Sequence, residues 1–493
     1  MASEVYDLVI TNGIVVTADE IREVDVAITG ETIAAIKERG AFREAQVAKF
    51  IDAKGGWVMP GGIDAHVHLQ EPQLFGKGRS VDTFETGTRS AICGGTTTVI
   101  AFAPQARSEE SVLPTLEATH SKAAGSAYAD YSFHIILSNP SPLALSEFPL
   151  LREAGISSLK IYMTYEVLQL NDTQILDVLF EARKHHLTTM IHAENNDVIL
   201  WMTKKLEERK LFAPKYHATS HPALAEVEAT YRAICLSEFI DAPILLVHIS
   251  SPVAADHARV AQGRGLPVFA ETCPQYVLLT KHDLDKPGFE GAMCVCSPPP
   301  RESEADHEGI WKGLVDGTFT VLSSDHCPFL YDDAETGKKT CISAEFPEGK
   351  FKYIPNGIPG IETRLPLTLS AERLDVRKFV EVTSTNVAKL YGLYPRKGEI
   401  AVGSDADIVI WNPESEATSF TLSNKMLHHA CDYTPYEGKT LKYWPVYTIL
   451  RGQVMWDQGA GGLIGKKGQG QFLRRGTSAL QGSRSEAEWD VTF

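Results

Sequence analysis

Eight short apolar runs, separated by longer segments with helical periodicity, limit the fold of this chain more than any other feature of its sequence. Residues 175–186 (ILDVLFEARKHH) and 226–239 are two of the helical segments. Eight strands that alternate with helices over roughly 340 residues are typical of a (β/α)8 TIM-type barrel with insertions. A doubly wound sheet is the alternative, but no G-x-G-x-x-G follows the first run and G-x-x-x-x-G-K-[ST] is missing from the chain. The eight runs are GGIDAHVHL, GTTTVIAF, YADYSFHIIL, SSLKIYM, LTTMIHAEN, PILLVHIS, LPVFAET and FTVLSSDH.

The two ends of the chain differ from its middle. Residues 6–38 are short β-type runs with the turn signals TNG and TGE, and similar runs return in GSDADIVIWNPE and WPVYTILRGQVMWDQG. We therefore predict an α/β protein in which residues 59–397 form the barrel, while residues 1–58 and 398–465 together form a small β-sandwich domain. Residues 466–493 are polar and rich in glycine, and we predict an extended C-terminal tail there.

Composition and charge exclude several classes of function. The chain is 43% hydrophobic and 22% charged, and no apolar stretch reaches the ~18 residues of a membrane span. A formal net charge of -16 argues against nucleic-acid binding. The 8 cysteines are scattered without a C-x-x-C pair, and the N-terminus MASEVYDLVITNG lacks the basic and apolar regions of a signal peptide. We expect a cytoplasmic protein with neither a membrane nor a nucleic acid as its partner.

Polar side chains interrupt or close five of the eight runs. In a (β/α)8 barrel the catalytic groups gather at the C-terminal ends of the strands, so these side chains are expected to share one pocket. They are His66 and His68 in the first run, Lys160 in the fourth, His192 in the fifth, His248 in the sixth and Asp325 in the eighth.

The two histidines one residue apart are the strongest of these signals. A single histidine at a strand end is more often a hydrogen-bonded core residue than a metal ligand. Residues i and i+2 of a strand point to the same face, so His66 and His68 can hold one cation between them while Ala65 and Val67 pack away from it. Four further histidines fall in helical or polar segments, and we interpret them as solvent-exposed: His185, His186, His428 and His429.

Lys160 is the unusual member of the set, because an ammonium is costly to bury beside metal ions. A salt bridge is the ordinary explanation for such a lysine. Burial also lowers the pKa of a lysine and leaves a neutral amine, which carbon dioxide can convert into an anionic carbamate able to bridge two metals. The residues alone leave both explanations open.

In this order, the same residues resemble the cyclic amidohydrolases of the amidohydrolase superfamily. The chain is most similar to dihydropyrimidinase and D-hydantoinase, and above all to the fungal dihydropyrimidinases. Further matches, which extend the resemblance over nearly the whole chain, are AETCPQY, CSPPPR, IPNGIPGIE and CDYTPYEG. The motifs that carry the site are the H-x-H of His66 and His68, SLKIYMTY around Lys160, MIHAEN around His192, LLVHISSP around His248 and SSDHCPF around Asp325.

This resemblance implies a site with two Zn²⁺ ions per subunit. One ion would be bound by His66, His68 and Asp325. The other would be bound by His192 and His248, and a carboxylated Lys160 and a hydroxide would bridge the two ions. The implied assembly is a homotetramer or homodimer.

The resemblance also implies a reaction and its substrate contacts. The bridging hydroxide would hydrolyse the cyclic amide bond of 5,6-dihydropyrimidines (dihydrouracil, dihydrothymine) or hydantoins to N-carbamoyl amino acids, as in pyrimidine catabolism. Asp325 would act as general base and then acid. Tyr165 would contact the substrate carbonyl and the developing oxyanion, while Ser297 and Asn356 would hold the cyclic amide through their backbone groups.

The sequence leaves several substrates possible and argues against one of them, dihydroorotate. Dihydroorotases carry an arginine two residues after the H-x-H motif to bind the substrate carboxylate, whereas this chain has Gln70. A cyclic imide hydrolase or an allantoinase-like ureide hydrolase on the same scaffold is the alternative, although allantoinases usually lack SLKIYMTY and IPNGIPGIE. Tyr162, Leu168 and the loop 72–78 would shape the pocket for the ring substituent.

Two further classes remain. A catalytically silent interaction protein would use the same scaffold with the tail as its binding segment, but six buried polar groups are costly to assemble without a ligand. A mononuclear, deaminase-like amidohydrolase would need one zinc ion and would use Lys160 as a salt-bridge partner. The number of zinc ions per chain separates these classes.

Overall fold

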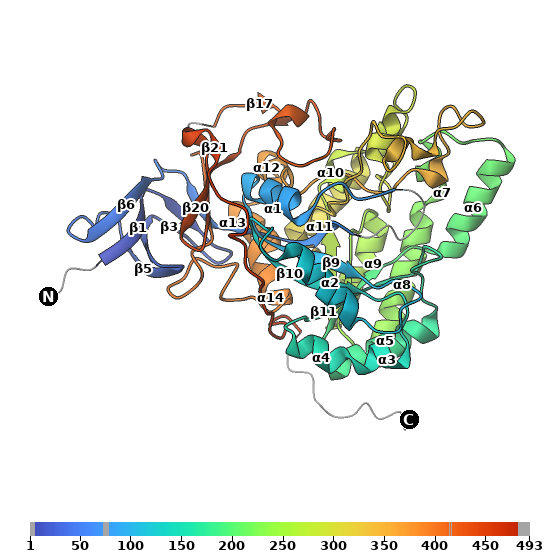
Figure 1. The fold of residues 1–493 in the computed structure, drawn as a ribbon, viewed down its shortest axis with the longest axis horizontal. Helices are drawn as coiled ribbons and strands as arrows, with labels where there is room; N and C mark the ends of the chain where they lie inside the picture. Colours follow the sequence, from blue (N-terminus) through green and yellow to red (C-terminus); the bar gives the residue numbers. More distant parts are fainter. Residues whose placement is uncertain (1–4, 72–77, 414, 416, 482–493) are drawn as a thin grey trace.

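The computed structural model describes residues 5–71, 78–413, 415 and 417–481. Its centre is an eight-stranded sheet in which every neighbouring pair is parallel and the strands follow their order in the chain (Figure 1). A parallel bridge between Val67 and His326 joins the two edges of this curled sheet, so the predicted (β/α)8 barrel is confirmed. The strands are β8 (Gly62–Val67), β9 (Thr96–Pro104), β10 (Asp130–Ile136), β11 (Ser158–Tyr162), β12 (Thr188–His192), β13 (Ile244–Leu246), β14 (Val268–Thr272) and β15 (Val321–Leu322).

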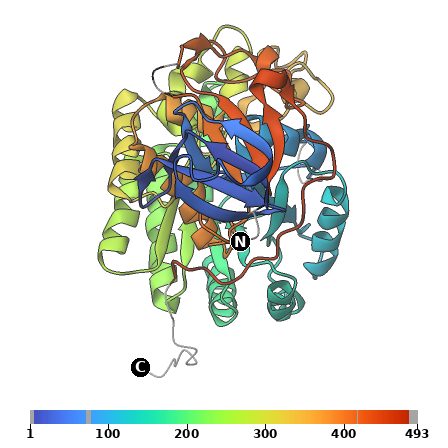
Figure 2. The same ribbon diagram turned by 90° about the vertical axis from the view of Figure 1, so that its left-hand side faces the viewer.

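Helices lie outside these strands (Figure 2). Local sequence explains several of their starts: Asn171 caps α5 in a capping box with Gln174, and Ser303 forms the corresponding box with Asp306 at α11. The helices are α1 (Phe84–Cys93), α2 (Leu113–Ala123), α3 (Pro142–Ser146), α4 (Phe148–Glu153), α5 (Asp172–Lys184), α6 (Asn196–Glu208), α7 (Tyr216–Ser220), α8 (Ala223–Ile240), α9 (Pro252–Gly263), α10 (Gln275–Leu278), α11 (Glu304–Asp316), α12 (Arg364–Ser370), α13 (Val376–Val380) and α14 (Asn386–Leu390).

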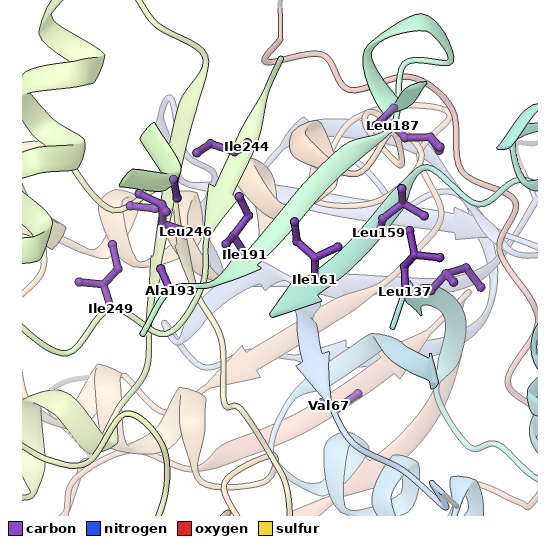
Figure 3. Close-up of a cluster of buried hydrophobic side chains, with 14 of the residues drawn as sticks. Val67, Leu137, Leu159, Ile161, Leu187, Ile191, Ala193, Ile244, Leu246 and Ile249 are labelled. Carbon is purple, nitrogen blue, oxygen red and sulfur yellow. The ribbon is translucent and has the colours of Figure 1, made fainter. Parts of the chain in front are cut away.

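The main core lies between the strands and the helices. Side chains of a strand alternate between the two faces, so Leu159 and Ile161 of β11 join this outer layer together with Ile191 of β12 and Leu246 of β13 (Figure 3). Each of these side chains is fully buried, which contributes roughly 1.5–3 kcal/mol per side chain. The outer layer therefore holds the strands firmly and leaves Lys160 to face the barrel interior.

Strands from both ends of the chain form a sandwich at one side of the barrel, where the blue and red segments lie together in Figure 1. The link between the ends is the antiparallel pair β7 and β16, and apolar side chains of the two sheets share one cluster. The predicted sandwich of both chain ends is thus confirmed, while its division from the barrel at residues 58 and 398 stays a prediction. One sheet contains β1 (Val5–Thr11), β4 (Val24–Thr29), β5 (Thr32–Glu38) and β6 (Gln46–Asp52); the other contains β2 (Ile14–Val16), β3 (Ile21–Arg22), β7 (Trp57–Pro60), β16 (Ile408–Trp411), β19 (Pro445–Leu450), β20 (Gln453–Asp457) and β21 (Gly462–Leu463).

The described part of the predicted tail, residues 466–481, runs along the chain's own barrel. Leu473 donates its backbone N–H to the carbonyl of Tyr131 at 2.7 Å, at the start of β10, and its side chain is fully buried. Arg475 donates its backbone N–H to the carbonyl of Gly155 at 2.8 Å. The segment therefore covers the N-terminal ends of the barrel strands. Residues 482–493 of the predicted tail lie outside the described residues.

Candidate metal centre

A cavity of about 690 Å³ lies at the C-terminal ends of the barrel strands. The structure brings all six predicted ligands to this one cavity, although they come from five strands. The three predicted substrate-binding residues line it as well. The residues concerned are His66, His68, Lys160, His192, His248 and Asp325, together with Tyr165, Ser297 and Asn356.

Three of these residues form a compact group of donors. The Nε2 atoms of His66 and His68 lie 3.2 Å and 3.6 Å from Oδ1 of Asp325. One ligand atom from each residue lies within 4.8 Å of the others. Imidazole nitrogen and carboxylate oxygen are the ligands that zinc prefers in proteins besides thiolate, so this group fits a zinc ion.

A local irregularity in β8 contributes to this geometry. The pairing of β8 with β9 shifts between Asp64 and Val67, which is the pattern of a β-bulge. Val67 packs in the outer layer as predicted. The prediction is wrong for Ala65, which packs in the interior cluster with Phe102, because the bulge interrupts the strict alternation of the strand.

A carboxylate lies next to the Nδ1 atom of each of the two histidines. Nδ1 of His66 lies 2.6 Å from Glu271 of β14, and Nδ1 of His68 lies 2.7 Å from Glu71. Each Nδ1–H can donate to its carboxylate, so that Nε2 faces the cavity and, in a neutral ring, offers a lone pair to a metal. Burial lowers the pKa of His68, but Glu71 and Asp325 outweigh it and raise this pKa to about 9. Burial lowers the pKa of His66 well below its ordinary value, and the Lys160 charge lowers it further, so the ring stays neutral as a ligand must be.

Lys160 is fully buried on β11, with its Nζ 3.5 Å from Nε2 of His66. Burial lowers the pKa of its amine to about 8, although Glu271 and Asp325 act in the opposite direction. Among the described residues, no carboxylate lies within 4.0 Å of this amine, so the salt bridge that would explain an ordinary lysine is not formed there. A readily deprotonated amine without an acidic partner fits carboxylation.

His192 and His248 form the other half of the cavity. Their ring centroids are 4.5 Å apart, and the ring of His248 is 5.4 Å from that of His66. Nε2 of His192 lies 2.8 Å from Glu194. Nδ1 of His248 is buried and has no hydrogen-bond partner within the described residues. A buried polar atom without a partner is costly, and a metal ion at this position would satisfy it.

Three residues of the site have left-handed backbone conformations, which residues other than glycine rarely adopt. The φ angles are 67° for Tyr165, 40° for His248 and 49° for Asp325. Such strain costs of order 1–3 kcal/mol per residue and concentrates at functional sites. This strain is consistent with residues whose side-chain directions serve the function of the site, at a cost in local stability.

Tyr165, Ser297 and Asn356 meet at one wall of the cavity, where the ring of Tyr165 lies 5.4 Å from that of His192. Asn356 donates from Nδ2 to Oγ of Ser297 at 3.2 Å, and both residues hydrogen-bond to the Tyr165 phenol. Burial raises the pKa of Tyr165 above its ordinary value, and Glu194 raises it further. The phenol therefore keeps its proton and can donate a hydrogen bond into the cavity.

An ion pair that the sequence did not reveal supports the loop after β13. Arg301 donates to Glu226 at 2.6 Å and to the hydroxyl of Ser250 at 2.8 Å, and all three residues are buried. Glu226 also accepts the backbone N–H of Ser250 at 2.8 Å. This network fixes the chain two residues beyond His248.

The segment 341–355 forms a largely apolar wall of the cavity, to which Ser343 and Lys352 also contribute. Tyr162 and Leu168 line the cavity as expected, as does Gly78, whereas residues 72–77 of the predicted loop lie outside the described residues. Gln70 is not among the described residues that line it. The sequence did not predict the wall residues Cys341, Phe346, Tyr353, Ile354 and Pro355.

The interpretation of His185, His186, His428 and His429 as solvent-exposed is wrong, because all four are only partly exposed. The side chain of His185 is 28% exposed and lies 3.0 Å from Glu181, and Nε2 of His429 is buried. His428 is the clearest case. Nδ1 of His428 lies 2.7 Å from the fully buried carboxylate of Glu362, which also accepts the His428 backbone N–H at 2.7 Å. The side chain of His428 is only 31% exposed. The polar sequence around it suggested solvent, but a buried acid far away in the chain provides its partner.

Known proteins resemble this chain over most of its length. Residues 57–455 match the sequence model of the Amidohydrolase family. The D-hydantoinase of Rhizobium radiobacter is 39% identical over 473 residues, which cover 95% of this chain and 99% of that protein. The D-hydantoinase of Geobacillus stearothermophilus is 40% identical over 94% of this chain and 96% of its own length. This chain belongs to the amidohydrolase family.

Solved structures agree with this assignment. The dihydropyrimidinase from Brevibacillus agri NCHU1002 superimposes with a TM-score of 0.89 at 38% identity, covering 95% of this amidohydrolase and 98% of that chain. A D-hydantoinase structure has the same TM-score and identity and covers 96% and 99%. The protein is a cyclic amidohydrolase of the hydantoinase and dihydropyrimidinase type. No helix in the described part of the chain is long and apolar enough to span a membrane.

Proposed function

We propose that this amidohydrolase hydrolyses the cyclic amide bond of 5,6-dihydropyrimidines or hydantoins in the cytoplasm and releases N-carbamoyl amino acids. The observation that supports this most is the convergence of four imidazoles, an amine and a carboxylate on one cavity. Relatives named D-hydantoinase and dihydropyrimidinase support the choice of ring. Cyclic imides and allantoin-like ureides are the alternative substrates on this scaffold.

The donor set fits two Zn²⁺ ions. His66, His68 and Asp325 would hold one ion, and His192 and His248 the other. Lys160 would join them after its neutral amine adds to carbon dioxide, which gives a carbamate anion and releases one proton. When bound, the two ions would supply an acidified water and polarisation of the substrate carbonyl.

Asp325 is placed to move the proton of this reaction. Its carboxylate faces His66 and His68, which outweigh the effect of burial and lower the pKa of Asp325 below its ordinary value. The ionised carboxylate takes the proton of the attacking water as the new C–O bond forms. It then gives that proton to the ring nitrogen as the C–N bond breaks, so that the ring opens to an N-carbamoyl acid.

Tyr165 is placed to stabilise the charge that develops on the carbonyl oxygen. Its protonated phenol donates to this oxygen, and removal of one such donor from an enzyme costs roughly 2.7–4 kcal/mol. Ser297 and Asn356 hold the cyclic amide through their backbone groups. Both flank the phenol, so substrate binding and oxyanion stabilisation occur at the same wall.

The test is a turnover panel on protein whose zinc content is measured. Dihydrouracil, dihydrothymine, hydantoin, a cyclic imide, allantoin and dihydroorotate are compared at equal enzyme concentration. We expect two zinc ions per chain and fastest turnover of a dihydropyrimidine or hydantoin. One zinc would favour the deaminase-like alternative, none would favour the interaction protein, and fast dihydroorotate hydrolysis would contradict the argument from Gln70. The homotetramer or homodimer stays a prediction, which the molar mass in solution tests.

A further inference from the structure

A buried guanidinium from the C-terminal segment enters the N-terminal end of the barrel. The side chain of Arg475 is 3% exposed and donates to the hydroxyls of Ser132 at 2.9 Å and Ser158 at 2.8 Å, and also to the carbonyl of Phe133. No carboxylate forms an ion pair with Arg475 within residues 5–481 so far as the structure describes them. A buried charge without a counter-ion is costly, which indicates that this guanidinium serves a function.

Arg475 begins a hydrogen-bond chain whose direction is fixed at both ends. A guanidinium can only donate, so Ser158 accepts from Arg475 and its own hydroxyl is free to donate to Nδ1 of His134, 2.5 Å away. The carbonyl of Ala65 can only accept, so His134 donates to it from Nε2 at 2.9 Å. Burial and then Arg475 lower the pKa of His134 well below the ordinary value, so the ring is neutral. Its one proton is then on Nε2, and Nδ1 accepts from Ser158.

This hydrogen-bond chain ends beside the residues that carry the metal donors. Ala65 directly precedes His66, and Ser158 lies two residues before Lys160 on the same face of β11. The ring of His134 also packs 5.2 Å from that of Phe102. Phe102 in turn stacks on His68 at 4.6 Å and meets the edge of His66 at 4.9 Å. Arg475, Ser158, His134 and Phe102 thus form the floor beneath the donor set.

We propose that Arg475 is a positioning residue for the metal centre, and that through it the C-terminal segment controls carboxylation of Lys160 and metal uptake. The proposal rests on the proposed two-zinc function. Arg475 touches neither substrate nor donors and acts through Ser158 and His134. Ser158, which accepts from the guanidinium, lies two residues before Lys160 on β11, so Arg475 holds the strand that carries the amine.

The test compares two substitutions of Arg475 with one substitution of the adjacent Arg474. Arg475→Gln removes the charge, while Arg475→Lys keeps the charge but loses the forked donor geometry. Arg474→Gln is the matched control, because the adjacent Arg474 is exposed and bonds only to the Glu153 carbonyl among the described residues. Each protein is stripped of metal with a chelator and reloaded with zinc over a range of bicarbonate concentrations. Zinc per chain and the ¹³C signal of a carbamate from labelled bicarbonate are measured, with circular dichroism as a check of folding.

We expect Arg475→Gln to need about tenfold more bicarbonate for half-maximal zinc uptake and to show a weaker carbamate signal, in line with the lower end of effects of groups that support metal ligands. Arg475→Lys is expected between Arg475→Gln and the unchanged chain, and Arg474→Gln is expected to behave as the unchanged chain does. A folded Arg475→Gln protein with unchanged bicarbonate dependence overturns the proposal, even if its melting temperature falls, because a purely structural role would affect stability alone.

A second variant covers the case in which Arg475→Gln does not fold. Ser158→Ala keeps the cation and its bonds to Ser132 and Phe133, and removes the hydroxyl that links Arg475 to His134. We expect it to shift the bicarbonate dependence in the same direction. An unchanged dependence in Ser158→Ala overturns the positioning chain. Failure of the proposed function is recognised separately, because then the unchanged chain itself takes up no zinc and shows no carbamate signal at any bicarbonate concentration.

Discussion

His66 and Asp325 meet where the barrel closes. His66 lies in β8 and Asp325 follows β15, the two edge strands of the eight-stranded sheet, and yet Nε2 of His66 is 3.2 Å from Oδ1 of Asp325. Backbone hydrogen bonds join the same two segments, from His326 to the carbonyl of His66 at 3.2 Å and from His68 to the carbonyl of His326 at 2.8 Å. Closing the barrel and assembling the donor group are therefore one structural event.

The proton-transfer role of Asp325 can be separated from metal binding by Asp325→Asn. The amide oxygen still offers a ligand atom, but an amide accepts no proton at neutral pH. We expect close to full zinc content and a kcat lower by roughly 10²–10⁴-fold. Zinc analysis and steady-state kinetics on dihydrouracil measure the two quantities. Asp332→Asn on the surface is the control, and near-normal turnover of a fully loaded Asp325→Asn protein would contradict the role.

Tyr165→Phe removes the phenol hydroxyl from the cavity, together with its hydrogen bonds to Ser297 and Asn356. Because the phenol acts on charge that is greatest in the transition state, kcat is expected to fall by about 10²–10³-fold while KM changes little. Tyr231→Phe on α8, where Tyr231 is 57% exposed, controls for the loss of a phenol elsewhere. A rise in KM at constant kcat would show instead that Tyr165 only binds the substrate.

Local patterns in the sequence were enough to predict the strands and the candidate donors. The period of two put His66 and His68 on one face, and the strand-end rule brought Lys160, His192 and Asp325 to one cavity. The pattern failed at Ala65, because a bulge changes the period and leaves no mark in a single apolar run.

Partners distant in the chain were not predictable in the same way. Glu271 lies in an ordinary strand, and its contact with His66 depends on how deep each side chain sits inside the closed barrel. Arg475 lies in a segment whose low apolar content indicates only a tail, although Leu473 beside it is buried in the barrel interior. Such contacts are set by tertiary packing, which one sequence without its relatives does not reveal.

The ion pair of Arg301 and Glu226 makes a prediction about stability. Arg301→Met keeps the length of the side chain but leaves the buried carboxylate of Glu226 without its cation, a change that typically costs 3–5 kcal/mol. Urea unfolding is expected to show a loss of about this size in the free energy of unfolding. Arg373→Met breaks the exposed pair with Glu308 and should cost roughly 0–1 kcal/mol. Equal effects of the two changes would contradict the importance of burial.

His428 makes a prediction about the pH dependence of stability. The hydrogen bond to Glu362 raises the pKa of His428 in the folded chain above its ordinary value of 6.5. Protonation therefore stabilises the folded state, fully so below pH 6.5, and this contribution is lost as the pH rises through the raised pKa. His428→Asn should lower the free energy of unfolding most below pH 6.5, with a difference that shrinks as the pH rises above that value. A difference that grows with pH, or one matched by His186→Asn in the turn after α5, would contradict this assignment.

The largely apolar wall formed by the segment 341–355 predicts which ring substituents the enzyme accepts. At about 690 Å³ the cavity exceeds the volume of a bare dihydropyrimidine ring several-fold. Phe346 belongs to its wall and is held by the ring of Phe212, 4.8 Å away. A hydantoin with an aromatic substituent at C5 can bury that substituent against Phe346, whereas dihydrouracil has no group that reaches it. We therefore expect Phe346→Ala to lower kcat/KM for the aryl hydantoin by roughly 10–100-fold and to leave kcat/KM for dihydrouracil unchanged. Leu200→Ala, at a 57% exposed position on α6, is the control, and parallel losses on both substrates would show that Phe346 supports the fold of the wall instead of the substituent.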